Sequence, residues 1–146
     1  MITGVNHVSF TVSNLDISVK FYKEVLGLKL LDVSERSSSF AAKATGFRGA
    51  RLKVAYLSAK DCSVELIEYL SPKGKKIDTT TCNIGSAHLC FNVNEIKKII
   101  RKIKKCGLKI ISEPLKIPAG PNKGKLMFYS EDPDSNTLEF ISNKRY

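Results

Sequence analysis

Two stretches of the sequence decide the fold: HVSFTVSNL at residues 7–15 and HLCFNVNEI at residues 88–96. When the second is placed over the first, a His, a Phe, a Val and an aliphatic residue coincide at an offset of 81. At an offset of 80, the segment GLKLL of residues 27–31 falls on GLKII of residues 107–111. Similarity at a fixed spacing is typical of a repeated structural unit, so we expect two copies of one module.

The later part of each copy contains a Glu among apolar residues, VELI at residues 64–67 and LEFI at residues 138–141. Each expected module therefore carries one His near its start and one Glu near its end. His7 and His88 are the only two histidines of the chain, and they hold equivalent positions in the repeat.

The first module is expected to have the order β-α-β-β-β. Residues 5–12 alternate between polar and apolar side chains, as a half-buried strand does. An apolar stripe with helical spacing then runs from Leu15 to Leu26, with Asn14 placed to cap its start and Gly27 placed to end it in a left-handed conformation. Three apolar stretches that are typical of strands follow: Leu28–Val33, Leu52–Leu57 and Val64–Leu70.

The second module is expected to repeat this order. A strand at Ala87–Val93 precedes a helix near Glu95–Cys106, which ends at Gly107. Three further strands are expected at Leu108–Ser112, Leu126–Ser130 and Thr137–Ser142. The segment DPDSN at residues 132–136 joins the last two strands with residues suited to a tight turn.

The expected fold class is therefore α+β, with two β-α-β-β-β modules that form a curved mixed sheet around a cavity. The modules cover residues 1–72 and 84–146, and a polar, Lys-rich linker at residues 73–83 joins them. Two other segments, Ser37–Gly49 and Pro118–Gly124, are expected to be loops, either mobile lids over a site or ordinary surface connections.

Length and composition are those of a globular protein. A chain of 146 residues is long enough for one domain with a buried core, and 42% hydrophobic with 26% charged residues excludes the disordered and coiled-coil classes. No apolar run reaches the roughly eighteen residues that a membrane span needs. The start of the chain, MITGVNHVSF, lacks the features of a signal peptide. We therefore expect a cytoplasmic protein with no membrane partner.

Cysteines and charge narrow the range of partners. The four cysteines have no C-x-x-C spacing, which argues against a disulfide framework and against a thiolate metal site. A net charge of +10 suits an anionic small-molecule substrate and could also attract nucleic acid. The densest basic run, at residues 97–105, alternates with isoleucines and contains no aromatic residue, so we interpret it as the solvated face of a helix and expect no nucleic-acid partner.

The two His and two Glu residues are candidates for a metal site. On the first strand of each module, the face that carries His7 or His88 is polar, which is costly unless it meets water, substrate or metal. Taken singly, each His could make one hydrogen bond and each Glu could be solvated at a strand end. Taken as a symmetric set, they suit one Zn, Ni, Fe, Mn or Co ion. In the first module the repeat favours Glu65, and Glu68 is the alternative.

These features resemble the vicinal oxygen chelate superfamily, which includes glyoxalase I, extradiol dioxygenases, methylmalonyl-CoA epimerase, and fosfomycin and bleomycin resistance proteins. The resemblance rests on HVSFTV, FYKEVLGL, VELI, SAHLCF and EDPDSNTLEF, at residues 7–12, 21–28, 64–67, 86–91 and 131–140. It implies a metal-binding cavity with His7, Glu65, His88 and Glu139 as ligands. The presence of all four argues against the bleomycin-binding members, which resemble this fold without a metal site.

A ligand set of two His and two Glu favours removal of a proton next to a carbonyl. We therefore expect a glyoxalase-like, metal-dependent isomerase or lyase, which acts on a small molecule with two vicinal oxygens and uses Glu65 or Glu139 as the base. The alternatives are an Fe(II) extradiol-type dioxygenase, an epimerase of a CoA ester, and a non-catalytic small-molecule binding or resistance protein. A homodimer is expected, with the modules paired within one chain or across the dimer.

Overall fold

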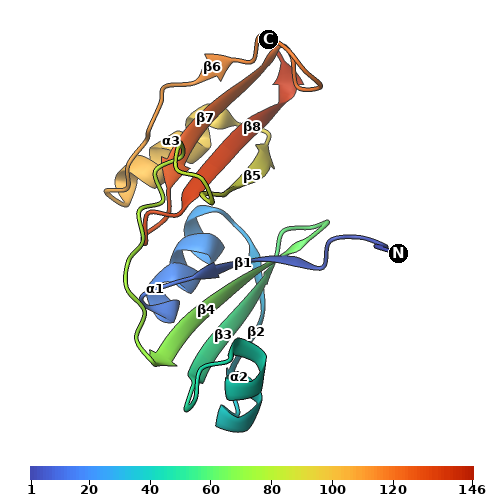
Figure 1. The fold of residues 1–146 in the computed structure, drawn as a ribbon. Coiled ribbons are helices and arrows are strands. Elements are labelled where there is room, and N and C mark those ends of the chain that lie inside the picture. The colour runs from blue at the N-terminus through green and yellow to red at the C-terminus, as the bar shows by residue number, and fades with distance from the viewer. The chain divides into compact units, whose positions relative to one another are not determined.

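The computed structural model describes residues 1–146, which divide into two compact units, Met1–Ile77 and Asp78–Tyr146. Each unit contains one mixed four-stranded sheet with at least one helix packed against it (Figure 1). The α+β class expected from the sequence is confirmed. None of the helices combines the length and the apolar character that crossing a bilayer requires.

The first unit forms sheet A, in which the strand order is β1-β4-β3-β2. Strand β1 is parallel to β4, and the other neighbouring strands are antiparallel. The elements are β1 (His7–Thr11), α1 (Leu15–Lys20), the π-helical turn η1 (Phe21–Val25), β2 (Lys29–Arg36), α2 (Ser38–Thr45), β3 (Arg51–Ser58) and β4 (Ser63–Ser71).

The second unit forms sheet B, in which the order β5-β8-β7-β6 matches that of sheet A. Strand β5 is parallel to β8, just as β1 is parallel to β4. The elements are β5 (His88–Val93), α3 (Ile96–Lys105), β6 (Leu115–Lys116), β7 (Lys125–Glu131) and β8 (Thr137–Arg145). The similarity found in the sequence is therefore a repeat of topology.

Local capping signals place the helix ends where the sequence predicts them. The Asn14 side chain accepts a hydrogen bond from the Ile17 backbone N–H over 3.0 Å, as an N-cap residue does. Gly27 and Gly107 follow the helical segments with φ values of 83° and 70°, in the left-handed region that glycine adopts without strain. The helical stretch after Leu15 does not stay α-helical throughout, because η1 continues α1 with π-helical hydrogen bonds.

The helix α1 and the turn η1 form a helical layer that covers one face of sheet A. The core of the first unit lies between this layer and the sheet. Alternate strand residues point toward this helix layer, since successive side chains of a strand point to opposite faces. The buried residues of this layer are Leu15, Ser18, Phe21, Tyr22, Ala55, Leu57, Val64 and Leu66. The opposite face of sheet A carries His7 and Glu65, and α2 packs against the part of it formed by Leu52 and Val54.

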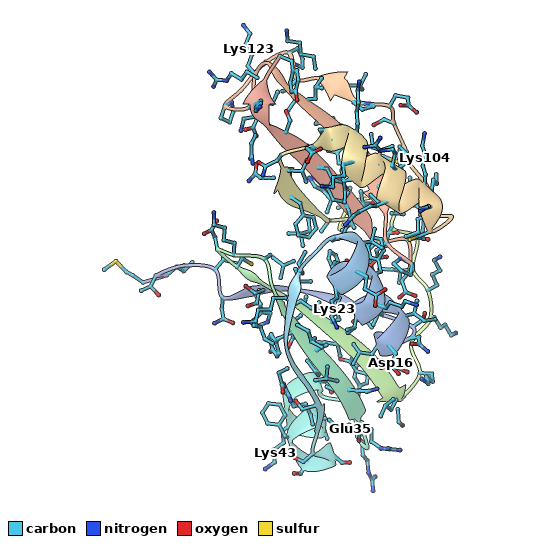
Figure 2. All side chains as sticks on the ribbon, turned by 180° about the vertical axis from the view of Figure 1, so that it is seen from behind. Asp16, Lys23, Glu35, Lys43, Lys104 and Lys123 are labelled. Carbon is cyan, nitrogen blue, oxygen red and sulfur yellow. The ribbon has the colours of Figure 1, made fainter.

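In the second unit, α3 packs its isoleucines against sheet B. Ile99 and Ile103 are buried, as are the stacked rings of Phe128 and Phe140. The basic residues between the isoleucines are exposed, so the solvated face predicted for this helix is confirmed. Figure 2 shows Lys104 on the side of α3 that faces away from the strands; its ammonium group lies 3.5 Å from the Glu113 carboxylate.

The expectation of a loop at Ser37–Gly49 is wrong, because this segment contains α2. The Ser37 side chain accepts a weak hydrogen bond from the Phe40 backbone N–H over 3.4 Å, and Gly46 ends the helix with a φ of 76°. The helix is short and only weakly amphipathic, so its sequence carries little periodic signal. It forms against sheet A, where Ala41 is buried with Ala50, Leu52 and Val54.

The expectation of a strand at Leu108–Ser112 is also wrong, since only one bridge, between Ile110 and Ser130, forms there. The Ser112 hydroxyl, and not a backbone carbonyl, accepts a hydrogen bond from the Tyr129 N–H over 3.3 Å, which interrupts a regular ladder. Residues 115–116 form β6 in its place. The segment at residues 118–124 is the connection between β6 and β7, closed by a bond from the Gly124 N–H to the Ile117 carbonyl.

The turn at residues 132–136 yields a stability prediction. The Asp132 carboxylate is buried and accepts hydrogen bonds from the backbone N–H groups of Asp134 and Asn136 and from the Asn136 side chain. Because hydrogen bonds to a charged group contribute about 1.5–3 kcal/mol each and are not additive, Asp132→Ala is expected to lower the free energy of unfolding by about 3 kcal/mol. Urea denaturation measures the loss. The exposed Glu113→Ala serves as control and is expected to change it by less than about 1 kcal/mol.

Candidate metal centre

In the first unit, His7 and Glu65 lie on the face of sheet A that α1 does not cover. Strand pairing places Ser9 opposite Glu65, so the side chains of His7 and Glu65 share one face. His7 Nε2 lies 3.4 Å from Glu65 Oε2. At the other ring nitrogen, Asn6 Oδ1 lies 2.8 Å from His7 Nδ1, so Nδ1–H donates to the amide oxygen and Nε2 faces the carboxylate.

The second unit repeats this arrangement in sheet B. Strand pairing places Cys90 opposite Glu139, so His88 and Glu139 share one face. His88 Nε2 lies 3.1 Å from Glu139 Oε2. Both carboxylates are largely buried and both imidazoles remain accessible, since the side-chain exposure is 12% for each Glu but 35% for His7 and 41% for His88.

A tyrosine completes each His–Glu pair, and the sequence reasoning missed both tyrosines. Tyr56 pairs with Glu65 across β3 and β4, and Tyr129 pairs with Glu139 across β7 and β8. The ring of Tyr56 contacts that of His7 edge to face, with the ring centroids 5.7 Å apart. The ring of Tyr129 contacts that of His88 in the same way, with the centroids 5.4 Å apart. The sequence signal for them is weak, because Tyr56 lies 9 residues before Glu65 and Tyr129 lies 10 residues before Glu139, and strand pairing shows their equivalence.

The two tyrosines interact differently with the carboxylates opposite them. The Tyr56 hydroxyl donates a short hydrogen bond to Glu65 Oε1. This hydrogen bond, followed by burial and the charge of Glu65, raises the pKa of Tyr56 above its usual range, while the Arg36 guanidinium acts in the opposite direction. In the second unit, burial first and the charge of Glu139 second raise the pKa of Tyr129. Glu65 is thus held by a neighbouring hydroxyl.

Glu139 has a thiol as its neighbour. Desolvation, the charge of Glu139 and a hydrogen bond to Glu139 together raise the pKa of Cys90 to about 12, and only Lys125 opposes the rise. Ser9 holds the equivalent position in the first unit, opposite Glu65. The two carboxylates therefore have different polar neighbours: the Tyr56 hydroxyl at Glu65 and the Cys90 thiol at Glu139.

Glu68, the alternative to Glu65, lies on the opposite face of β4. Its Oε2 accepts a hydrogen bond from the Leu15 backbone N–H over 2.9 Å, and its Oε1 lies 3.2 Å from the Lys73 ammonium group. A carboxylate at a helix N-terminus satisfies an unpaired N–H group and complements the helix dipole. The geometry therefore accounts for Glu68 as a stabilising group for α1.

This position of Glu68 leads to a second prediction. Glu68→Gln is expected to lower the free energy of unfolding by about 1 kcal/mol, because the amide still accepts a hydrogen bond from Leu15 but loses the charge that favours the helix N-terminus. Metal content after reconstitution is expected to stay at the wild-type value. A metal content that fell as far as in Glu65→Gln would instead identify Glu68 as a ligand.

Within each unit, the His–Glu pair has the spacing of two ligands of a divalent metal. Two ligands on one ion, with bonds of about 2.0–2.1 Å, have donor atoms roughly 2.8–3.4 Å apart at octahedral to tetrahedral angles. The His–Glu distances of 3.4 Å and 3.1 Å fall at or within this range. Neither unit by itself brings together three or more His, Cys, Asp or Glu side chains around one point. The four-ligand set expected from the sequence is therefore not brought together within either unit.

Comparison with known proteins identifies the family. Residues 4–140 match the model of the Glyoxalase/Bleomycin resistance protein/Dioxygenase superfamily, and the chain belongs to this family. The resemblance found in the sequence is confirmed.

Two relatives and one solved structure are similar over most of their length. A lactoylglutathione lyase from Haemophilus influenzae is 28% identical, over 94% of this chain and 91% of its own. A 2-epi-5-epi-valiolone epimerase from Actinomyces sp. is 28% identical, over 95% of this chain and 79% of its own. The structure of a glyoxalase family protein from Bacillus cereus, 19% identical, superposes with a TM-score of 0.85 over 97% of this chain and 95% of its own, which shows a shared fold.

Proposed function

We propose that this protein is a metal-dependent isomerase or lyase of the glyoxalase type, which acts on a small molecule with two vicinal oxygens. The observation that carries the proposal is the duplicated arrangement of His, Glu and Tyr, with imidazole-to-carboxylate distances of 3.4 Å and 3.1 Å on equivalent strands. The relatives named as a lyase and an epimerase support it, since both kinds of reaction move protons within a substrate.

In this proposal, His7, Glu65, His88 and Glu139 hold one divalent ion, either Ni, Zn, Co, Mn or Fe. The bound ion supplies Lewis-acid polarisation of two adjacent substrate oxygens. The pairs meet within one chain or across a homodimer, since swapping identical elements between protomers costs little. A cytoplasmic location belongs to the same proposal.

The proton transfer falls to the carboxylates of the chain. Glu65 or Glu139 takes a proton from the substrate carbon next to the carbonyl and returns it to the neighbouring carbon. The Tyr56 hydroxyl holds one oxygen of Glu65 and orients that carboxylate, whereas Glu139 faces the thiol of Cys90. Because the two environments differ, Glu65→Gln and Glu139→Gln are expected to reduce turnover to different extents.

Metal content is the first experiment. Protein purified without chelator is analysed for metals, then reconstituted with Ni, Co, Zn, Mn and Fe(II) in turn. The proposal requires a stoichiometric ion, whether one per chain or one per site shared between chains. A stoichiometry near zero after every reconstitution would leave His7 and His88 as ordinary hydrogen-bonding residues of the two sheets.

Reaction class is the second experiment. The reconstituted protein is incubated separately with a hemithioacetal, with CoA esters in deuterated water, and with a catechol under oxygen. Thioester formation or deuterium at a substrate carbon supports the proposal, because both require proton transfer next to a carbonyl. Oxygen uptake with Fe(II) alone would identify an extradiol-type dioxygenase, and tight binding of a small molecule without turnover would favour a binding or resistance protein.

Epimerisation is a second candidate reaction, favoured by the similarity to the Actinomyces epimerase. It uses the same carboxylates, with a proton removed from one face of a carbon and returned to the other. Deuterium incorporation at a single stereocentre, without change in the carbon skeleton, distinguishes it from the lyase reaction. A CoA ester is one substrate class in which this outcome can be observed.

A further inference from the structure

We propose that Arg36 binds an anionic oxygen group of the substrate, a carboxylate or a phosphate, on the same face of sheet A as Glu65. This inference rests on the proposed function of that face and assigns its substrate class. It starts from a difference between the two units: on the face of Glu65 a guanidinium joins Ser34 and Asp32 in one network, whereas the cation that acts on Cys90 beside Glu139 is Lys125, which donates to Asn122.

The network begins on β2, where alternate residues share the face of Glu65. Pairing of β2 with β3 places Asp32 opposite Tyr56 and Arg36 opposite Leu52, and pairing of β3 with β4 places Tyr56 opposite Glu65. Arg36 Nη1 donates to Ser34 Oγ over 2.5 Å, and the Ser34 hydroxyl donates to Asp32 Oδ2 over 2.7 Å.

The Arg36 guanidinium lies close enough to the Tyr56 hydroxyl to lower its pKa, and that hydroxyl itself donates to Glu65. Arg36 and the carboxylate of the candidate centre therefore share one neighbour on one face of the sheet. A small molecule with one end at Glu65 is expected to place an anionic group at Arg36.

Arg36 keeps binding capacity for such a group. A guanidinium has five N–H donors in a planar fork that matches carboxylate and phosphate oxygens, and the contacts with Ser34 and Tyr56 occupy only part of it. No carboxylate of the chain lies within ion-pair distance of Arg36, although Lys53, Lys73 and Lys109 each have one. The side chain is half-buried, so solvent screens its charge less than that of a surface lysine.

The surroundings favour an anion at this position. The apolar cluster beneath α2, including Leu52 and Val54, borders the same face, with Ile67 and Tyr69 packed against it. Charge-assisted hydrogen bonds are stronger beside such apolar groups than in bulk water. In the second unit, Lys116 is exposed on the two-residue strand β6, where it pairs with Leu126.

Binding of two matched probes to the metal-reconstituted protein tests the inference. Acetohydroxamate offers two vicinal oxygens, and the monohydroxamate of succinic acid adds a carboxylate. Calorimetry is expected to show that the wild type binds the carboxylated probe about tenfold or more tightly than acetohydroxamate, the low end for hydrogen bonds to a charged group. Arg36→Gln is expected to abolish this preference while leaving the affinity for acetohydroxamate within about threefold of the wild-type value. Lys116→Gln is expected to retain the preference for the carboxylated probe.

A metal-free measurement separates this inference from the proposed function. The Nε–H resonance of Arg36 in 15N-labelled protein is identified by its loss in Arg36→Gln, and succinate and inorganic phosphate are then titrated. A saturable shift supports the inference even where no metal binds and the hydroxamates fail, and the ligand with the tighter fit identifies the anion as carboxylate or phosphate. An unmoved resonance, or a probe preference unchanged in Arg36→Gln, would overturn it.

Discussion

Replacement of His88 by alanine is expected to weaken divalent-metal binding by more than about 100-fold. Loss of a residue that merely orients a ligand costs about 10–100-fold, and the proposed role of His88 is that of a ligand itself. Its imidazole faces the Glu139 carboxylate at 3.1 Å and remains accessible. Competition with a chromophoric chelator measures the affinity, and circular dichroism checks that the variant is folded.

The matched control for this experiment is Glu113→Gln, which removes a charge from an exposed residue of the same unit. It is expected to leave the metal affinity at the wild-type value. Equal affinities in His88→Ala and the wild type would remove His88 from the proposed ligand set. His7→Ala is expected to behave as His88→Ala does, since the repeat gives both imidazoles the same partner.

Truncation of Phe140 to alanine is expected to lower the free energy of unfolding by about 3–5 kcal/mol, the usual range for Phe→Ala in a core. The side chain is 1% exposed. Its ring stacks on those of Phe128 and Phe91, with ring centroids 4.9 Å and 5.8 Å apart. The cavity would lie between sheet B and α3, whose packed isoleucines limit collapse.

Urea denaturation followed by circular dichroism measures the loss for Phe140, since the chain has no Trp to report by fluorescence. Ile84→Ala is the control within the same unit, because that side chain is fully exposed, and it is expected to change the stability by less than about 0.5 kcal/mol. A loss below about 1 kcal/mol for Phe140→Ala would show that the stacked rings are not part of a close-packed core.

Much of the fold could be predicted from the sequence, because its signals are local. Strand alternation, the cap at Asn14 and the glycines at residues 27 and 107 depend on neighbours within a few positions. The α2 helix could not be predicted in this way, since it depends on burial of Ala41 against Leu52 and Val54. The irregular stretch before β6 could not either, because the Ser112 hydroxyl replaces a backbone acceptor.

The duplicated topology and the equivalent positions of one His and one Glu in each copy could be predicted from the sequence, because both follow from the repeat and from side-chain periodicity along single strands. Which side chains meet across strands depends instead on how the strands pair. Register placed Tyr56 opposite Glu65 and Asp32 opposite Tyr56, and it turned Glu68 away to the end of α1. These contacts join residues of different elements, and strand pairing, which no local pattern encodes, sets their distances.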